Sequence, residues 1–419
     1  MSRPKRPAIV IAAMALATAL GGSGVAGDGS GTSNVDLFDA AGAECAHCQD
    51  GTPHEWDAPP FRFDWSLALR GAYVRNSTGT SFEALMVPTG SLEHSFLRGR
   101  YSLNGSAELS RTTLEDFRIK ALRLGAAGDY QIATQLGLSG SANLSFVTPS
   151  ASTTGYPTST VSASREITGD ATISARYDFG RLSGTLRGSA GRSVYGPTTL
   201  ANGTQLDNRA NDNWRLASGL RIGYAVTPIV TAFVDGGLGY QAYDVIAPSY
   251  GAKLDATDVT LRGGLAAKWN EVFEGEVSAG LGYRQFAFAA APNFVSQLYD
   301  ASLTFRPDET LALRGGLATT VGAPGPNAGG AARIEYAATG DVAYQVNPWV
   351  RLRANASYRY AFFSDSTTVE TGYGLGSGAD YLLSERLALT ADYGFSASTS
   401  STSAATEEHR ITLGATLKR

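Results

Sequence analysis

The sequence predicts an all-β protein: a transmembrane antiparallel up-and-down β-barrel of about eighteen strands, within a range of sixteen to twenty. Three observations support this prediction. The 419 residues include 49 glycines and only 17% charged residues, a composition that favours strands and turns over long helices. Long stretches alternate between apolar and polar residues, and short turns introduced by an aromatic residue recur along the chain.

The first 27 residues have the pattern of a secretory signal peptide. Arg3, Lys5 and Arg6 precede an apolar run from Pro7 to Leu20, and small residues suited to a signal peptidase follow. A membrane anchor is the alternative, but this run is shorter than the roughly 20 residues that a spanning helix needs. We therefore expect residues 1–27 to direct the chain out of the cytoplasm.

Residues 28–60 are expected to be a flexible periplasmic leader, since they lack a regular apolar period. They contain Cys45 and Cys48 in a C-x-x-C spacing, with His47 and His54 close by. No strand and helix pattern of a thioredoxin-like site follows, Gln49 stands where a haem-binding motif needs histidine, and a zinc site would be cramped. We interpret the pair as a disulfide outside the cytoplasm, and we predict no metal site.

Alternation begins at the start of the predicted barrel, residues 61–419. In "FRFDWSLALRGAYVRN", which starts at Phe61, apolar and polar residues take opposite faces of one strand. The same pattern returns in "VRLRANASYRYAF", which starts at Val350, and in "FEGEVSAGLGY", which starts at Phe273. Ten residues of strand tilted by about 40° span roughly 25 Å, the height of the apolar band of an outer membrane. The strands thus fit a bilayer.

The turns distinguish a membrane barrel from a soluble sandwich, in which alternation is also found. Seven short turns begin with an aromatic residue on the apolar face, and these residues recur every 36 to 47 positions. An amphipathic ring at a strand end is favoured at the depth of lipid headgroups. The predicted aromatic girdle comprises Tyr130, Tyr177, Tyr224, Trp269, Phe305, Tyr344 and Tyr381.

The strand count follows from these turns. An eighth short turn lies near Arg98 to Tyr101, and a first strand from Phe61 and a last one at "HRITLGATLK" bring the total to eighteen. Both ends of the barrel then lie on the periplasmic side. Longer loops are expected at the opposite end, at residues 195–212, 247–258, 322–330 and 397–408. A β-propeller also has a period near 42 residues, but each of its blades needs four short strands.

The segments "YGPTTLANGTQLDN", "LYDASLTFRPDETLALRGG" and "GADYLLSERLALTADYGF" resemble the bacterial outer-membrane proteins grouped as putative β-barrel porin 2. The resemblance covers most of residues 60–419, and it rests on the general character of these segments more than on a diagnostic motif. Some members of that group accompany exopolysaccharide secretion genes, which implies a saccharide conduit. Most such barrels end on an aromatic residue used by the outer-membrane assembly machinery, an expected partner, whereas this chain ends "GATLKR".

The polar faces of the strands are expected to line the barrel, and their charges are mixed in sign. Arg351, Arg353 and Arg359 lie on one strand with no acid on the same face, which suggests a basic stripe that favours anions. Alternatively, the charges pair across strands and stiffen the wall. The candidate pore-lining residues are Arg262, Arg284, Arg314, Arg351, Arg353, Arg359, Glu274 and Glu276.

Composition and motifs exclude several classes of function. The net charge of −4 argues against the extended basic surface that binds the phosphates of nucleic acids. The four histidines, His47, His54, His94 and His409, lack a serine motif beside them, and G-x-S-x-G is absent. We therefore predict no enzyme activity and no cofactor.

The sequence is best explained by a passive outer-membrane channel, surrounded by lipid, for small polar solutes, anions among them. The alternatives are an exopolysaccharide conduit and a plugged barrel with a structural or adhesive role. The solute, the oligomeric state and the closure of the pore stay open at this point.

Overall fold

The computed structural model describes residues 61–76, 79–112, 117–149, 159–325, 330–401 and 403–419. The predicted signal peptide and the leader with Cys45 and Cys48 lie outside these residues. In the described part of the chain, no helix is long and apolar enough to cross a membrane.

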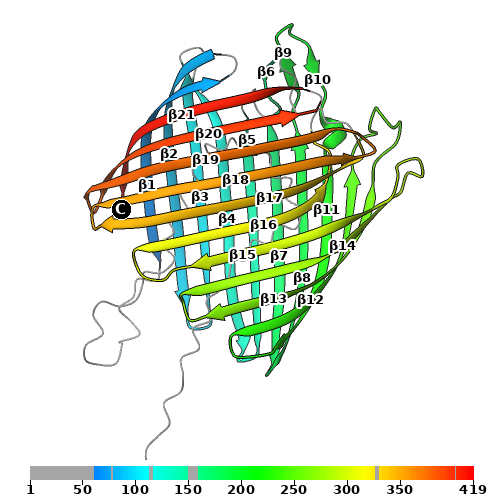
Figure 1. Cartoon of the computed structure of the whole chain (residues 1–419), viewed down its shortest axis with the longest axis horizontal. Helices are drawn as coiled ribbons and strands as arrows, with labels where there is room; N and C mark the ends of the chain where they lie inside the picture. Colours follow the sequence, from blue (N-terminus) through cyan, green and yellow to red (C-terminus); the bar gives the residue numbers. More distant parts are fainter. Residues whose placement is uncertain (1–60, 77–78, 113–116, 150–158, 326–329, 402) are drawn as a thin grey trace, which may run out of the picture.

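The described residues form one closed antiparallel barrel of eighteen strands (Figure 1), which confirms the predicted fold class and strand number. Each strand pairs with the next along the chain, and β21 pairs with β1 to close the ring. The wall consists of β1 (Arg62–Asn76), β2 (Gly79–Phe96), β3 (Gly99–Thr112), β4 (Arg118–Ala133), β5 (Leu136–Val147), β7 (Glu166–Phe179), β8 (Leu182–Tyr195), β11 (Asn213–Ala225), β12 (Val230–Tyr243), β13 (Ala256–Trp269), β14 (Phe273–Phe286), β15 (Phe294–Phe305), β16 (Leu311–Gly322), β17 (Ala332–Asn347), β18 (Val350–Ser364), β19 (Val369–Ser384), β20 (Leu387–Ser400) and β21 (Ser403–Lys418).

The two ends of the barrel differ in their connections. All eight predicted short turns are present at one end, the short-turn end, where both β1 begins and β21 finishes. At the other, the long-loop end, residues 195–212 leave the barrel and contribute β9 (Thr198–Leu200), β10 (Gln205–Leu206) and the 3-10 helix η2 (Arg209–Asn211). With β6 (Thr160–Ser162), β9 and β10 make a small three-stranded sheet beyond the rim (Figure 1).

One predicted loop is wrong. Residues 397–408 are rich in serine and threonine, but β20 runs to Ser400 and β21 begins at Ser403, so most of this segment is strand. Its backbone groups find ladder partners within the hairpin, where Ser398 lies opposite Thr406. Threonine suits a strand, and hairpin pairing outweighs the turn preference of serine.

Apolar side chains face outward over most of the barrel, as expected for a wall in lipid. Leu220, Leu261 and Leu413 on three different strands are 50%, 61% and 62% exposed. The largest packed apolar cluster in the described residues lies at the long-loop end and includes Tyr243, Leu254 and Phe286.

One seam in the wall is incomplete. β15 pairs with β16 only from Ala301 to Phe305, against Leu313 to Leu317. The ladders on either side, β14 with β15 and β16 with β17, each contain twelve residue pairs. The long-loop halves of β15 and β16 therefore lack the usual backbone ladder between them.

Candidate channel wall

The register places the predicted pore-lining residues on one face. Directly opposed residues of paired strands point to the same side of a sheet, and successive residues point to opposite sides. Following the pairs from Arg221 through Asp235 to Arg262 and around the ring defines an inner face. All eight candidates occupy it: Arg262 on β13, Glu274, Glu276 and Arg284 on β14, Arg314 on β16, and Arg351, Arg353 and Arg359 on β18. Their role in permeation stays a prediction.

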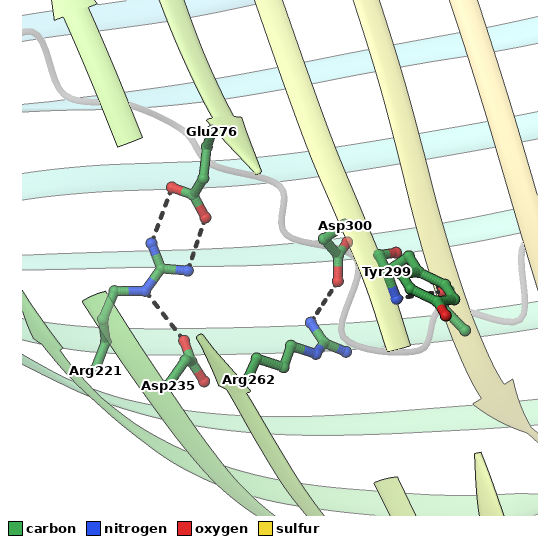
Figure 2. Close-up of polar contacts among 7 residues, drawn as sticks. Arg221, Asp235, Arg262, Glu276, Tyr299 and Asp300 are labelled. Carbon is green, nitrogen blue, oxygen red and sulfur yellow. Dashed lines mark hydrogen bonds and ion pairs between the residues drawn. The ribbon is translucent and has the colours of Figure 1, made fainter. Parts of the chain in front are cut away.

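The first charged cluster on this face joins strands β11 to β15 (Figure 2). Arg221 donates from Nε to Asp235 at 3.1 Å and from both Nη atoms to Glu276 at 2.9 and 3.0 Å. Arg262 donates from Nη1 to Asp300 at 2.5 Å, two strands away. The two-pronged contact with Glu276 fixes the Arg221 guanidinium in both position and orientation, and a single hydrogen bond to Asp300 anchors Arg262. These arginines are therefore held along the wall.

A second cluster changes the interpretation of the predicted basic stripe. Arg351 and Arg353 both donate to Asp380 of β19, at 3.1 and 2.9 Å from their Nε atoms. Arg353 also reaches Asp392 of β20 from Nη2 at 2.9 Å. Although β18 carries no acid on its inner face, acids on the neighbouring strands β19 and β20 pair with its residues Arg351 and Arg353.

Arg284 belongs to a third, deeply buried cluster near the long-loop end. Its side chain is 2% exposed and donates to both carboxylate oxygens of Asp258, at 2.7 and 2.8 Å. It also donates to Gln241 Oε1 at 2.9 Å and to the backbone carbonyl of Gly322 at 3.2 Å. A charge buried this deeply and paired this fully serves to hold the wall together.

Some of the charged residues were not singled out from the sequence. Arg410 on β21 reaches across β1 and donates to Glu83 of β2 at 2.7 Å, and Lys120 of β4 lies 3.6 Å from the other oxygen of Glu83. These contacts bridge the seam that closes the barrel. Alternation could have placed Arg410 and Glu83 on the inner face, whereas Lys120 turns inward at an irregularity of the β3–β4 register. Only the ring closure brings β21 beside β1 and β2.

Inner-face glycines make room for these bridging side chains. Gly378 of β19 lies opposite both Arg353 and Asp392, and a Cβ atom there would approach Asp392 Oδ1 to 2.1 Å. At Gly376 a Cβ atom would approach Asn355 Oδ1 to 2.0 Å. Glycine within a strand permits such close approach. Polar side chains consequently lie flat on the wall where they would otherwise project into the lumen.

Arg123 of β4 differs from the paired arginines. It occupies the inner face opposite Ser106 and Ser145, and it is exposed. Among the described residues, none forms an ion pair or hydrogen bond with its guanidinium.

The predicted girdle residues all lie on the outer face near the short turns. Six are between 37% and 55% exposed, whereas Phe305 is half-buried. A second set of outward aromatics, which the turn pattern did not reveal, lies nearer the long-loop end and includes Trp214, Tyr240 and Tyr283. The interfacial role of both sets stays a prediction.

The two described histidines also lie on the outer face. His94 stacks on Phe61 with ring centroids 4.6 Å apart. His409 Nδ1 lies 2.9 Å from the hydroxyl of Tyr393. Both rings are parts of aromatic clusters, and neither contacts a serine hydroxyl within the described hydrogen bonds.

Outside the strands, the residue after β12 is bound back to the barrel rim. Arg192 of β8 donates to both carboxylate oxygens of Asp244, with Nη1 at 2.9 Å from Oδ1. This hydrogen bond lowers the pKa of Asp244 below its ordinary value. The pair ties the loop that begins at Asp244 to β8.

Comparisons with solved structures give low similarity. Pseudomonas aeruginosa OccK3 (OpdO) is 13% identical, with a TM-score of 0.42 and coverage of 85% of this chain and 96% of that one. Pseudomonas aeruginosa OpdK, solved with vanillate, is 10% identical, with a TM-score of 0.44 and coverage of 85% and 99%. A loop L8 deletion mutant of Vibrio cholerae OmpT is 14% identical, with a TM-score of 0.34 and coverage of 86% and 100%.

No curated protein matches the chain. The profile of the family described as putative beta-barrel porin 2, in contrast, matches residues 72–419, which include seventeen complete strands of the barrel and the last third of β1. This match agrees with the closed barrel and with its outward apolar face, features of bacterial outer-membrane proteins. The chain is a β-barrel of the bacterial outer membrane and belongs to the putative beta-barrel porin 2 family.

Proposed function

We propose that the protein is a passive outer-membrane channel for small polar solutes. The observation that carries this proposal is the inner face, which presents a polar, mixed-charge surface over most of the ring of strands. An eighteen-stranded barrel encloses a lumen wide enough for water. A polar wall around such a lumen favours solutes that carry their own hydrogen-bonding groups.

The arrangement of the charges supports passage over tight binding. Arg221, Arg262 and Arg353 are each paired with acids and held along the wall. Conduction requires binding that is favourable enough for entry and weak enough for exit. Prepaired charges meet this requirement, because a solute that contacts them must compete with an existing ion pair.

A preference for anions would come from arginines whose charge is not offset. Arg123 is the candidate, because it is exposed on the inner face and makes no ion pair with the described residues. The predicted stripe of Arg351, Arg353 and Arg359 is a weaker candidate, since Asp380 and Asp392 neutralise much of its charge.

Planar-bilayer conductance of the refolded protein tests the proposal. Stable open-channel steps, with a reversal potential in a salt gradient that reports ion preference, are the expected result. Folding is checked on the same sample by heat-modifiable gel mobility. A folded barrel that passes no current and no small sugar into vesicles would refute the channel and favour a plugged barrel.

A further inference from the structure

The incomplete seam between β15 and β16 is closed by side chains where the backbone ladder stops. If the register continued beyond Ala301 and Leu317, Tyr299 would lie opposite Thr319. Instead, the Thr319 hydroxyl accepts a hydrogen bond from Tyr299 N at 2.8 Å and donates one to Tyr299 O at 2.9 Å. Tyr299 lies beside Asp300 on β15 (Figure 2). One hydroxyl therefore takes the place of a backbone pair.

Two further side chains cross the same seam from opposite faces. Tyr336 of β17, on the outer face, reaches past β16 and donates to Gln297 O at 3.3 Å. Arg284 of β14, on the inner face, reaches past β15 and donates to Gly322 O at 3.2 Å. Backbone groups facing lipid must be satisfied, because no water is present there to bind them. Three side chains thus supply some of the hydrogen bonds that the backbone ladder would have supplied across the seam. We call Thr319, Tyr336 and Arg284 the three latches.

Latches differ from a ladder in how they open. A ladder of twelve pairs, as between β16 and β17, breaks only when many backbone bonds are lost together. Here three side chains carry the contacts, and side chains change rotamer without moving the strands. Within the described wall, two neighbouring strands are therefore easiest to separate at the long-loop half of this seam, because the smallest number of contacts must break there.

The long-loop half of the seam carries apolar side chains on both faces, beside the polar residues that cross it. On the inner face, Leu298 is 2% exposed, and Phe286 and Phe294 pack nearby at the long-loop end. On the outer face, Val295 is 63% exposed and Leu317 is 37% exposed. An alkyl chain would meet apolar side chains on either side of the wall at this seam, whereas its polar end would meet the polar inner face of the neighbouring strands.

We propose that the long-loop half of the β15–β16 seam is a lateral gate through which an amphipathic solute with an alkyl chain passes between the lumen and the outer leaflet. The long-loop end faces outward in barrels of this class, which places the gate beside the outer leaflet. The proposal rests on the proposed channel for supply of solute to the lumen, but the opening of the seam can be tested separately.

The test is chemical access from the lipid. In a Cys45→Ser, Cys48→Ser background, Leu298→Cys is reconstituted in vesicles whose lipid contains N-dodecylmaleimide, and alkylation is followed by mass spectrometry. The matched control is Ala361→Cys, since Ala361 is also buried on the inner face but lies between complete ladders of β17, β18 and β19. We expect Leu298→Cys to react at least several-fold faster than Ala361→Cys.

Removal of a latch should speed this reaction. Thr319→Val deletes both hydrogen bonds to Tyr299 with little change of shape, and we expect about a tenfold rise in alkylation of Leu298→Cys. Thr371→Val on the outer face of fully paired β19 should cause no rise. If Leu298→Cys does not fold by gel mobility, Ser296→Cys, on the same strand and face, replaces it.

The outcomes separate the gate from the channel. Equal alkylation of Leu298→Cys and Ala361→Cys, unchanged by Thr319→Val, overturns the gate even in a barrel that conducts ions. Fast alkylation in a barrel that conducts no ions supports an opening seam and refutes the passive channel. A water-soluble maleimide applied to the same variants reports access through the lumen, and a rate equal to that of the dodecyl reagent would also overturn the lipid route.

Discussion

Arg353 and Asp392 form an ion pair across an intervening strand. The guanidinium leaves β18, passes over Gly378 of β19 and donates to the carboxylate on β20, with Nη2 at 2.9 Å from Oδ1. Arg262 reaches Asp300 in the same way from β13 to β15, past Gly280 of β14. Long polar side chains thereby lie along the wall of the barrel.

Gly378→Ala should narrow the lumen. The added Cβ atom would stand 2.1 Å from Asp392 Oδ1, so the carboxylate must turn away from Arg353, which keeps its contacts with Asp380. We expect a lower single-channel conductance, because the displaced Asp392 side chain projects inward. Gly394→Ala is the control, since a Cβ atom there meets nothing within 4 Å on the same inner face. Equal conductance of the two variants would contradict the role assigned to Gly378.

Arg353→Gln should destabilise the barrel. It leaves the carboxylates of Asp380 and Asp392, which are 9% and 11% exposed, without their shared cation. Removing one partner of a largely buried polar contact costs about 1–3 kcal/mol, so the urea midpoint in lipid vesicles should fall. Arg176→Gln is the comparison: its partner Asp178 is exposed, and the loss should stay below about 1 kcal/mol. A midpoint no lower than that of Arg176→Gln would refute this prediction.

Arg123→Glu should shift ion preference toward cations. The charge change occurs at an exposed inner-face site without an ion pair among the described residues. The reversal potential in a salt gradient measures the effect, and Arg75→Glu on the outer face serves as control. A shift of the same size in both variants would show that position on the inner face does not matter.

The Arg192–Asp244 pair should make the rim sensitive to acid. Since Arg192 lowers the pKa of Asp244, the carboxylate contributes stability above its unfolded pKa and loses it as pH falls through the lower folded pKa. The pair is partly exposed, so the effect should not exceed about 1 kcal/mol. The temperature of the gel-mobility shift, compared with that of Asp244→Asn at neutral and acidic pH, measures it. A difference between the two proteins that does not shrink below about pH 4 would contradict the assignment.

Several features of the fold were accessible from local sequence. Alternation from Phe61 and Val350 onward identified strands, because side chains of a strand take opposite faces every two residues. The aromatic residue before each short turn, such as Tyr344, marked the hairpins and hence the number of strands. Residues 397–408 were misassigned, because composition does not report whether a segment has a partner in the ladder.

The sequence by itself determined the barrel, its strand number and the face on which most of the charged residues lie. Which charges meet was decided only by the tertiary structure. Arg353 lies 39 positions from Asp392, and Arg410 lies 327 positions from Glu83. Their pairing depends on the stagger between strands and on ring closure, which arise when all ladders form together. The incomplete β15–β16 seam has the same origin, because only the mutual register of the two strands shows that the ladder stops.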